Sequence, residues 1–437
     1  MGKLVVLRLD GDALEQGFRV TLAIWEGDNR SASHPVIETA GYLPPVPELA
    51  THLQHHWLHN YRCLGAPYRL EAIGINYGGS VNQRIHECIE SANQLRSHLT
   101  RWLDSESFRP IDRRLREELN RDETIRFLIR TDDKHLQKLP WHLWDFIERY
   151  PKAEIALSPT KILPKIPLIK QTPHTTCKTQ VKILAILGHS TGINIDADRK
   201  LLENLPHCET TFLVEPKHHQ INEQLWEKPW DIIFFAGHSK TEGETGRIYI
   251  NPTDSLTINE LWYALKKAVE RGLKLAIFNS CDGLGLARQL DDLQIPQIIV
   301  MRELVPDEVA QEFLKYFLSA FAGGKSFYLA AREARERLQG MESRFPCASW
   351  LPVICQNLAE EFLSWPKPPI QQKQWWHRWQ RVLVASVAVT SVVMGIRMLG
   401  VLQPWELKGF DSLMQLRPAE KPDPRLLIVQ VTASDIA

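Results

Sequence analysis

Residues 273–285, LKLAIFNSCDGLG, run from a short apolar segment directly into a cysteine and two glycines. The apolar segment is typical of a buried strand, and the glycines allow the chain to turn and to begin a helix. Cys281 therefore ends a predicted strand. It is either a buried thiol, since free cysteine is among the most buried residue types, or a nucleophile at the edge of a sheet.

The region around this stretch, residues 110–357, alternates strand-like and helix-like segments. Such alternation predicts an α/β fold in which a mostly parallel sheet is flanked by helices. Ligands bind sheets of this kind at the carboxyl ends of the strands. The predicted strands are TIRFLIRT (124–131), VKILAILG (181–188), DIIFFAG (231–237), LKLAIFN (273–279) and QIIVM (297–301).

A histidine follows DIIFFAG, the predicted strand that comes before LKLAIFN in the chain. DIIFFAGHS (231–239) ends in His238 and Ser239. If the two strands are neighbours, the imidazole and the Cys281 thiol reach the same edge of the sheet. Histidine acts as a general base or acid near neutral pH and a thiolate is nucleophilic, so the pair has the chemistry of acyl transfer. Gly283 begins a predicted helix whose N–H groups would stabilise the thiolate.

Other motifs offer weaker alternatives. His189 in LGHSTG (187–192) also follows a predicted strand and is a rival base. That loop lacks the Gly-Lys-Ser/Thr ending of a phosphate loop, and GGKS (323–326) lacks the preceding strand, so nucleotide binding is not predicted. His55 and His59 are four residues apart on a predicted helix, but no HExxH pattern or cysteine pair completes a metal site. We therefore predict neither a metal nor a cofactor.

Composition excludes some classes of function. The chain has 52 basic and 52 acidic residues, which does not favour a nucleic-acid partner. The N-terminal apolar run is broken by Arg8 and Asp10 and does not resemble a signal peptide. The seven cysteines contain no CxxC pair, which argues against a disulfide framework or a zinc site and favours a reducing compartment. They lie at positions 63, 88, 177, 208, 281, 347 and 355.

The C-terminal part predicts a membrane span. Residues 382–402, VLVASVAVTSVVMGIRMLGVL, are long enough to cross a bilayer as a helix, although Arg397 leaves a buried core helix as the alternative. The preceding linker, 358–381, is rich in proline, tryptophan and basic residues, which predicts a single-pass protein of the plasma (inner) membrane with its N-terminal side in the cytoplasm. Residues 403–437 contain one strand-like run, at 425–433, and because one strand cannot make a domain we expect this segment to be disordered or loosely held. Residues 1–105 form a predicted smaller α+β module.

Several segments resemble a known family. The similar stretches are LPWHLW (139–144), FFAGHS (234–239), LAIFNSCDGLGLARQL (275–290) and VPDEVAQEFLKYFLSAFAGGKSFYLAAREARERL (305–338). Together they resemble the CHAT domain, a caspase-like peptidase family related to separase, over residues 110–357. Residues 403–437 resemble the truncated start of a CHASE2 sensor domain, an arrangement associated with cyanobacteria.

The resemblance implies a caspase-like fold and a cysteine endopeptidase. His238 would be the base and Cys281 the nucleophile, with the backbone N–H groups of Ser239 and Cys281 holding the oxyanion; many relatives carry glycine where Ser239 stands. The separase branch prefers arginine before the cleaved bond, which needs an acid in the pocket; Asp307 is favoured over Asp282.

The implied partners are a protein or peptide substrate, the membrane, and a partner chain or oligomer through the sensor part. The alternative function is a catalytically silent interaction module that relays a signal through its fold.

Overall fold

The computed structural model describes residues 2–11, 14–27, 35–65, 68, 80–159, 180–242, 245–357, 363–366, 372–418, 425 and 429. Contacts between residues divide the chain into two compact units, Met1–Pro368 and Pro369–Ala437.

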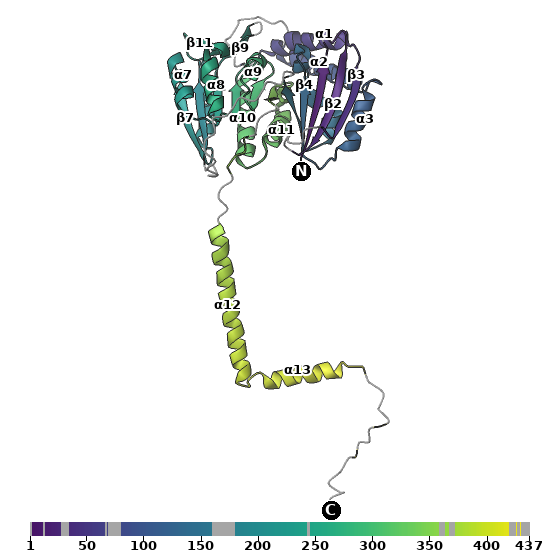
Figure 1. The fold of residues 1–437 in the computed structure, drawn as a ribbon, viewed down its shortest axis with the longest axis vertical. Helices are drawn as coiled ribbons and strands as arrows, with labels where there is room; N and C mark the ends of the chain where they lie inside the picture. The colour runs from purple at the N-terminus through teal and green to yellow at the C-terminus, as the bar shows by residue number, and fades with distance from the viewer. Residues whose placement is uncertain are drawn as a thin grey trace, which may run out of the picture. The chain divides into compact units, whose positions relative to one another are not determined.

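An eleven-stranded sheet forms the centre of the first unit, in the order β3-β2-β1-β4-β5-β14-β13-β12-β8-β6-β7 (Figure 1). In chain order the strands are β1 (Lys3–Asp10), β2 (Phe18–Glu26), β3 (Ile37–Leu43), β4 (Ile125–Arg130), β5 (Ala153–Ser158), β6 (Val181–Leu187), β7 (Cys208–Val214), β8 (Ile232–Ala236), β12 (Leu275–Asn279), β13 (Gln297–Met301) and β14 (Pro352–Gln356). All five strands predicted within residues 110–357 are present.

Most neighbouring strands are parallel, which confirms the predicted α/β class. The pairs β1–β4, β4–β5 and β5–β14 are parallel, and so are β13–β12, β12–β8, β8–β6 and β6–β7. β13 and β14 are antiparallel, so the two parallel groups run in opposite directions. The hairpins β1–β2 and β2–β3 extend one side, so the strands of residues 1–105 share the sheet with those of residues 110–357.

Helices flank this sheet, and its central strands are therefore mostly apolar. Every residue of β8 and β12 is buried, as expected for parallel strands covered on both faces. The helices are α1 (Pro47–His55), α2 (Val81–Leu103), α3 (Arg109–Glu118), α4 (Lys134–Lys138), α5 (Asp145–Arg149), α6 (Ile195–Glu203), α7 (His218–Glu227), α8 (Trp262–Glu270), α9 (Leu284–Asp291), α10 (Asp307–Ala322) and α11 (Phe327–Leu338).

Short elements complete the first unit. A π-helical segment, η1 (His56–Tyr61), continues α1, and the single turns η2 (Arg62–Leu64) and η6 (Ala348–Trp350) are 3₁₀ helices. A second, three-stranded antiparallel sheet follows β8 and has the order β11-β10-β9. Its strands are β9 (Ser239–Glu242), β10 (Thr245–Tyr249) and β11 (Ser255–Thr257).

His142, between α4 and α5, makes stability depend on pH. Burial, and then the charges of Arg335 and Arg302, hold the pKa of His142 well below its usual range. The unfolded chain binds this proton near pH 6.5, so below that pH the unfolded state holds more protons and the free energy of unfolding falls as pH falls, by up to about 1.4 kcal/mol per pH unit. We expect His142→Gln to flatten this slope between about pH 6.5 and pH 5. Urea unfolding followed by circular dichroism measures it, and an unchanged slope would contradict the assignment.

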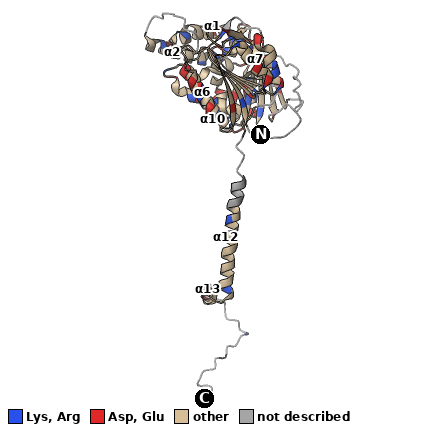
Figure 2. Cartoon of the chain, turned by 90° about the vertical axis from the view of Figure 1, so that its left-hand side faces the viewer, with Lys and Arg blue, Asp and Glu red and all other residues tan. Residues whose placement is uncertain are grey.

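The second unit contains two helices, α12 (Gln372–Met398) and α13 (Gln403–Gln415). Within the described residues, Trp379–Met398 is the one helical segment that is long and apolar enough to cross a membrane by length and composition, with mean hydropathy 1.6. Its charged residues are Arg381 and Arg397, one near each end (Figure 2).

Residues Gln403–Gln415 form the helix α13. Pro404 at the start of α13 suits a first helical turn, and Glu406 forms an ion pair with Arg397 at 3.2 Å. α13 buries no residue. The predicted strand at 425–433 falls, apart from two single residues, outside the described part of the chain.

Candidate active site

The strands that end at His238 and Cys281 are neighbours. β8 and β12 pair in parallel, and Ala236 is the partner of Asn279. His238 and Cys281 each follow two residues after this pair, so they reach the same edge of the sheet, as the sequence predicts. The Ser239 hydroxyl donates a hydrogen bond to the carbonyl oxygen of Cys281 and lies 2.8 Å from the Ser280 hydroxyl. Side-chain contacts therefore join the two segments beyond the paired strands.

The turn after β8 depends on Gly237. This residue has φ +155°, and a Cβ atom there would lie 3.2 Å from the Cα atom of Gly188, which follows β6. The close approach allows the His238 backbone N–H to donate to the carbonyl oxygen of His189 at 3.2 Å. His238 is thereby held against the segment that follows β6.

The tautomer of His238 follows from its hydrogen bond. Nε2 donates to the carbonyl oxygen of Thr191 at 3.0 Å, so the ring proton lies on Nε2. Nδ1 then carries the lone pair, and this buried atom has no hydrogen-bond partner among the described residues. A neutral imidazole held in this way can accept a proton at Nδ1, while the Thr191 carbonyl stabilises the resulting cation. Sequence reasoning missed Thr191 because its contribution is a backbone oxygen.

The Cys281 thiol contacts the segment that follows β13. It is fully buried, its sulfur accepts a hydrogen bond from the Val305 N–H at 3.3 Å, and it lies 3.7 Å from the Val305 carbonyl oxygen. Asp282 adopts the left-handed conformation (φ +47°), and a Cβ atom at Gly283 would lie 2.7 Å from the Cβ atom of Val300. An N–H group of Val305 thus lies at the sulfur, and α9 begins three residues after Cys281.

The two side chains are close in the fold but not joined. Among the described residues Nδ1 of His238 has no hydrogen-bond partner, so the thiol is not hydrogen-bonded to this atom. Both are closed off from solvent, with His238 2% and Cys281 0% exposed. The rival base His189 follows β6, which lies on the other side of β8 from the strand of Cys281, and its ring is 5.4 Å from that of His238.

The candidate substrate-binding acids have structural partners. The carboxylate of Asp307, at the start of α10, accepts hydrogen bonds from the Asn194 N–H at 3.2 Å and from Gln311 Nε2 at 2.8 Å. It therefore connects α10 to the residue that precedes α6. The Asp282 N–H donates to the carbonyl oxygen of Glu303 at 3.3 Å.

Glu303 is a charged residue of this region that the sequence does not single out. It lies two residues after β13, and its carboxylate, 1% exposed, contacts Arg62 Nε at 2.8 Å and Lys138 Nζ at 3.3 Å. Burial lowers the pKa of Arg62, but the Glu303 carboxylate more than compensates and raises it. The Tyr61 hydroxyl donates to the carbonyl oxygen of Leu304 at 2.7 Å. Residues 303–305, which contact the thiol, are therefore held in place by two distant segments. One contains Tyr61 and Arg62, and the other contains Lys138.

Comparison with known proteins identifies the family. Residues 97–376 match the model of the CHAT domain family. The chain belongs to the CHAT domain family. No curated protein matches this CHAT chain by sequence.

Two solved structures resemble the CHAT chain. In the separase–securin complex of Saccharomyces cerevisiae, the match has a TM-score of 0.52 at 11% identity and covers 81% of this chain and 30% of that one. The chain therefore shares the fold but spans less than a third of the separase chain. The Arg-specific cysteine proteinase gingipain R matches with a TM-score of 0.36 at 9% identity, over 63% of this chain and 70% of that one.

Proposed function

We propose that this CHAT chain is a cysteine endopeptidase. The observation that supports it most is the parallel pairing of β8 with β12, which sets His238 and Cys281 at equal distances beyond the paired residues Ala236 and Asn279. A nucleophile and a base at one sheet edge are what acyl transfer requires. The Thr191 carbonyl, which fixes the tautomer of His238, supplies the third group that orients the base.

The reaction follows from these groups. Nδ1 of His238 takes the thiol proton, and the Cys281 sulfur forms a bond to the peptide carbonyl carbon. The proton on Nδ1 then passes to the leaving amine as the peptide bond breaks, and water hydrolyses the thioester to release the acid and the thiol. The backbone N–H groups of Ser239 and Cys281 would hold the oxyanion.

The described arrangement corresponds to a closed form in this proposal. A peptide must reach Cys281, and the thiol is buried against Val305. Movement of residues 303–305 is the smallest change that would free the sulfur and let it approach Nδ1 of His238. A signal received elsewhere in the chain would act by releasing this segment.

The proposed substrates are proteins or peptides cut after a basic residue, with Asp307 as the recognising acid. The full chain should cleave a peptide library after Arg or Lys, and Asp307→Asn should weaken that preference while Asp282→Asn, the control, retains it. Cleavage after Asp alone would refute the specificity, and failure of the chain to cut any member under activating conditions would refute the peptidase.

A catalytically silent interaction module is the second candidate. The observation that favours it is the burial of both His238 and Cys281 without a hydrogen bond between them. In that case the pair would be part of the core, and partner proteins would contact the fold rather than be cleaved. Covalent labelling of Cys281 distinguishes the two functions.

We also propose that α12 anchors the peptidase to the plasma (inner) membrane with its N-terminal side in the cytoplasm. Four cations precede or begin the apolar stretch, at positions 367, 373, 378 and 381, whereas Lys408 and Arg417 follow it more sparsely. An excess of nearby Lys and Arg on one side sets the orientation of a span. The segment after the span would then belong to an extracytoplasmic sensor of the CHASE2 type.

Protease accessibility tests the anchoring. In spheroplasts, protease added from outside should leave the unit Met1–Pro368 intact, because the proposed orientation puts this unit on the cytoplasmic side of the membrane. A separate soluble protein of the cytoplasm serves as the control for sealed membranes, since it must survive until detergent is added. Digestion of the first unit in sealed spheroplasts would show that the orientation is the opposite one. Recovery of the whole chain in the soluble fraction would show that α12 does not span the membrane.

A further inference from the structure

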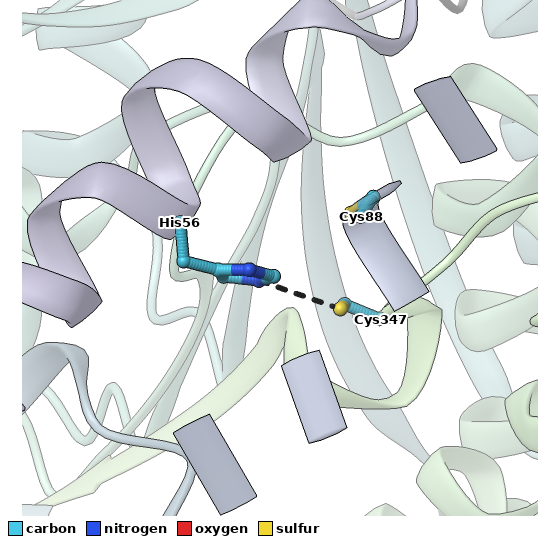
Figure 3. A group of neighbouring side chains, drawn as sticks. All are labelled: His56, Cys88 and Cys347. Carbon is cyan, nitrogen blue, oxygen red and sulfur yellow. Dashed lines mark hydrogen bonds between the residues drawn. The ribbon is translucent and has the colours of Figure 1, made fainter. Parts of the chain in front are cut away.

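A second group of His and Cys side chains lies away from His238 and Cys281. His56 begins the π-helical segment η1, Cys88 lies on α2, and Cys347 precedes η6 (Figure 3). Their ligand atoms lie within 4.8 Å of one another, and all three residues are buried. They come from segments far apart in the sequence, so the fold and not a local motif assembles them.

The spacing suits a single metal ion. His56 Nε2 and Cys347 Sγ are 3.6 Å apart and face each other (Figure 3). Two ligands of one tetrahedral Zn²⁺ lie about 3.5 Å apart, given Zn–S near 2.3 Å and Zn–N near 2.0 Å. The Cys88 sulfur lies within 4.8 Å of both of these atoms and is the third member of the group.

A neighbouring hydroxyl orients the imidazole. His56 Nδ1 lies 3.0 Å from the Ser91 hydroxyl, which also lies 3.1 Å from His52 Nε2. When Nδ1–H donates to Ser91, the lone pair is on Nε2 and faces Cys347. Metal-binding histidines are commonly fixed in this way by a hydrogen bond from the other ring nitrogen.

The backbone around these residues is unusual on two sides. η1 is a π-helix, a rare form that is frequent at functional sites. Cys347 has φ +62°, a left-handed conformation that a non-glycine residue seldom adopts and that costs on the order of 1 kcal/mol or more. Trp350, with its ring centroid 5.6 Å from that of His56, covers one side of the imidazole. The backbone is therefore irregular both at His56 and at Cys347.

We propose that His56, Cys88 and Cys347 bind one Zn²⁺ ion that joins the N-terminal part of the CHAT chain to the segment before β14. Binding replaces two S–H bonds by two S–Zn bonds and releases two protons to solvent, while neutral His56 contributes the Nε2 lone pair. Cys347 also lines a cavity of about 680 Å³, whose wall includes Glu342 and Trp350. A water molecule or a small anion from this cavity would be the fourth ligand.

Metal content of the full chain, purified in detergent and under reducing conditions, tests the site. We expect one Zn²⁺ per chain after exchange against a weak chelator, and a thiolate-to-metal absorption band when Co²⁺ replaces it. Cys88→Ala and Cys347→Ala should lose both signals, whereas Cys355→Ala, a buried cysteine of β14 outside the group, should keep them.

Ser91→Ala keeps the proposal testable if the cysteine variants fail to fold. Alanine suits the interior of α2, and loss of the hydrogen bond to His56 should weaken Zn²⁺ binding about 10- to 100-fold in competition with a chromogenic chelator. Full-strength binding by Ser91→Ala would overturn the site, and so would unchanged metal content in cysteine variants that fold. So would absence of bound Zn²⁺ from the reduced wild-type chain, or a Cys88–Cys347 disulfide in its place.

Discussion

Replacing Cys281 with alanine is expected to abolish peptide cleavage by the CHAT chain. The thiol is the group that bonds to the substrate in the proposed mechanism, and removing such a nucleophile lowers the rate by about a thousandfold or more. The substitution removes one buried sulfur atom and its contact with the Val305 N–H, so the fold should persist. Cleavage of a fluorogenic peptide after Arg, followed with purified full chain, measures the loss.

Cys355→Ala is the matched control for this prediction. Cys355 is also a buried cysteine near the end of a central strand, β14, but it is not part of the proposed dyad. It should retain full activity, while His238→Ala should fall with Cys281→Ala because the thiol then has no base. Equal activity of Cys281→Ala and the wild-type chain would show that Cys281 and His238 are not the catalytic dyad.

Glu303→Gln is expected to speed chemical modification of Cys281. Neutralising this buried carboxylate removes the charge opposite Arg62 and Lys138, which are partly exposed and can be hydrated, so we expect a loss of stability of about 1.5 kcal/mol. The effect is local to residues 303–305, which hold the thiol through Val305. We expect more frequent opening of this segment and at least about a tenfold faster reaction of Cys281 with iodoacetamide, since each 1.4 kcal/mol shifts an opening equilibrium tenfold.

Glu154→Gln provides the control for a simple loss of stability. Glu154 on β5 forms a more buried ion pair with Arg335, at 2.8 Å, in the other parallel group of strands. Its loss should lower the unfolding free energy by at least as much without changing the reaction rate of Cys281. If both variants accelerate the reaction equally, global unfolding and not release of residues 303–305 exposes the thiol.

The sequence predicts the central strands and the edge at which they end. DIIFFAG and LKLAIFN are continuous apolar runs of strand length, and runs of this kind fit strands that helices cover on both faces. The residues after them, His238 and Cys281, then fall at one edge once the strands pair in parallel. The helix predicted to begin at Gly283 is α9, which starts directly after this residue. A Cβ atom at Gly283 would lie 2.7 Å from the Cβ atom of Val300, so this position has no room for a side chain.

The contacts that close the site could not be predicted in the same way. The thiol meets Val305 through backbone atoms, and backbone atoms carry no signature in a sequence. Glu303 contacts Arg62 and Lys138, which are 241 and 165 residues away in the sequence, so tertiary folding alone brings these charges together. The absence of a CxxC pair argues against a local zinc motif, but it cannot reveal His56, Cys88 and Cys347, which tertiary folding brings together.

The most direct test of the peptidase is to map the residue modified by an irreversible peptide electrophile that carries Arg at its reactive end. Cys63 and Cys208 are partly exposed, whereas Cys281 is buried, so exposure alone favours the first two. The account predicts a covalent adduct on Cys281, found by tandem mass spectrometry, that is lost in His238→Ala. Adducts on Cys63 and Cys208 with none on Cys281, under conditions where the chain processes a protein substrate, would contradict it.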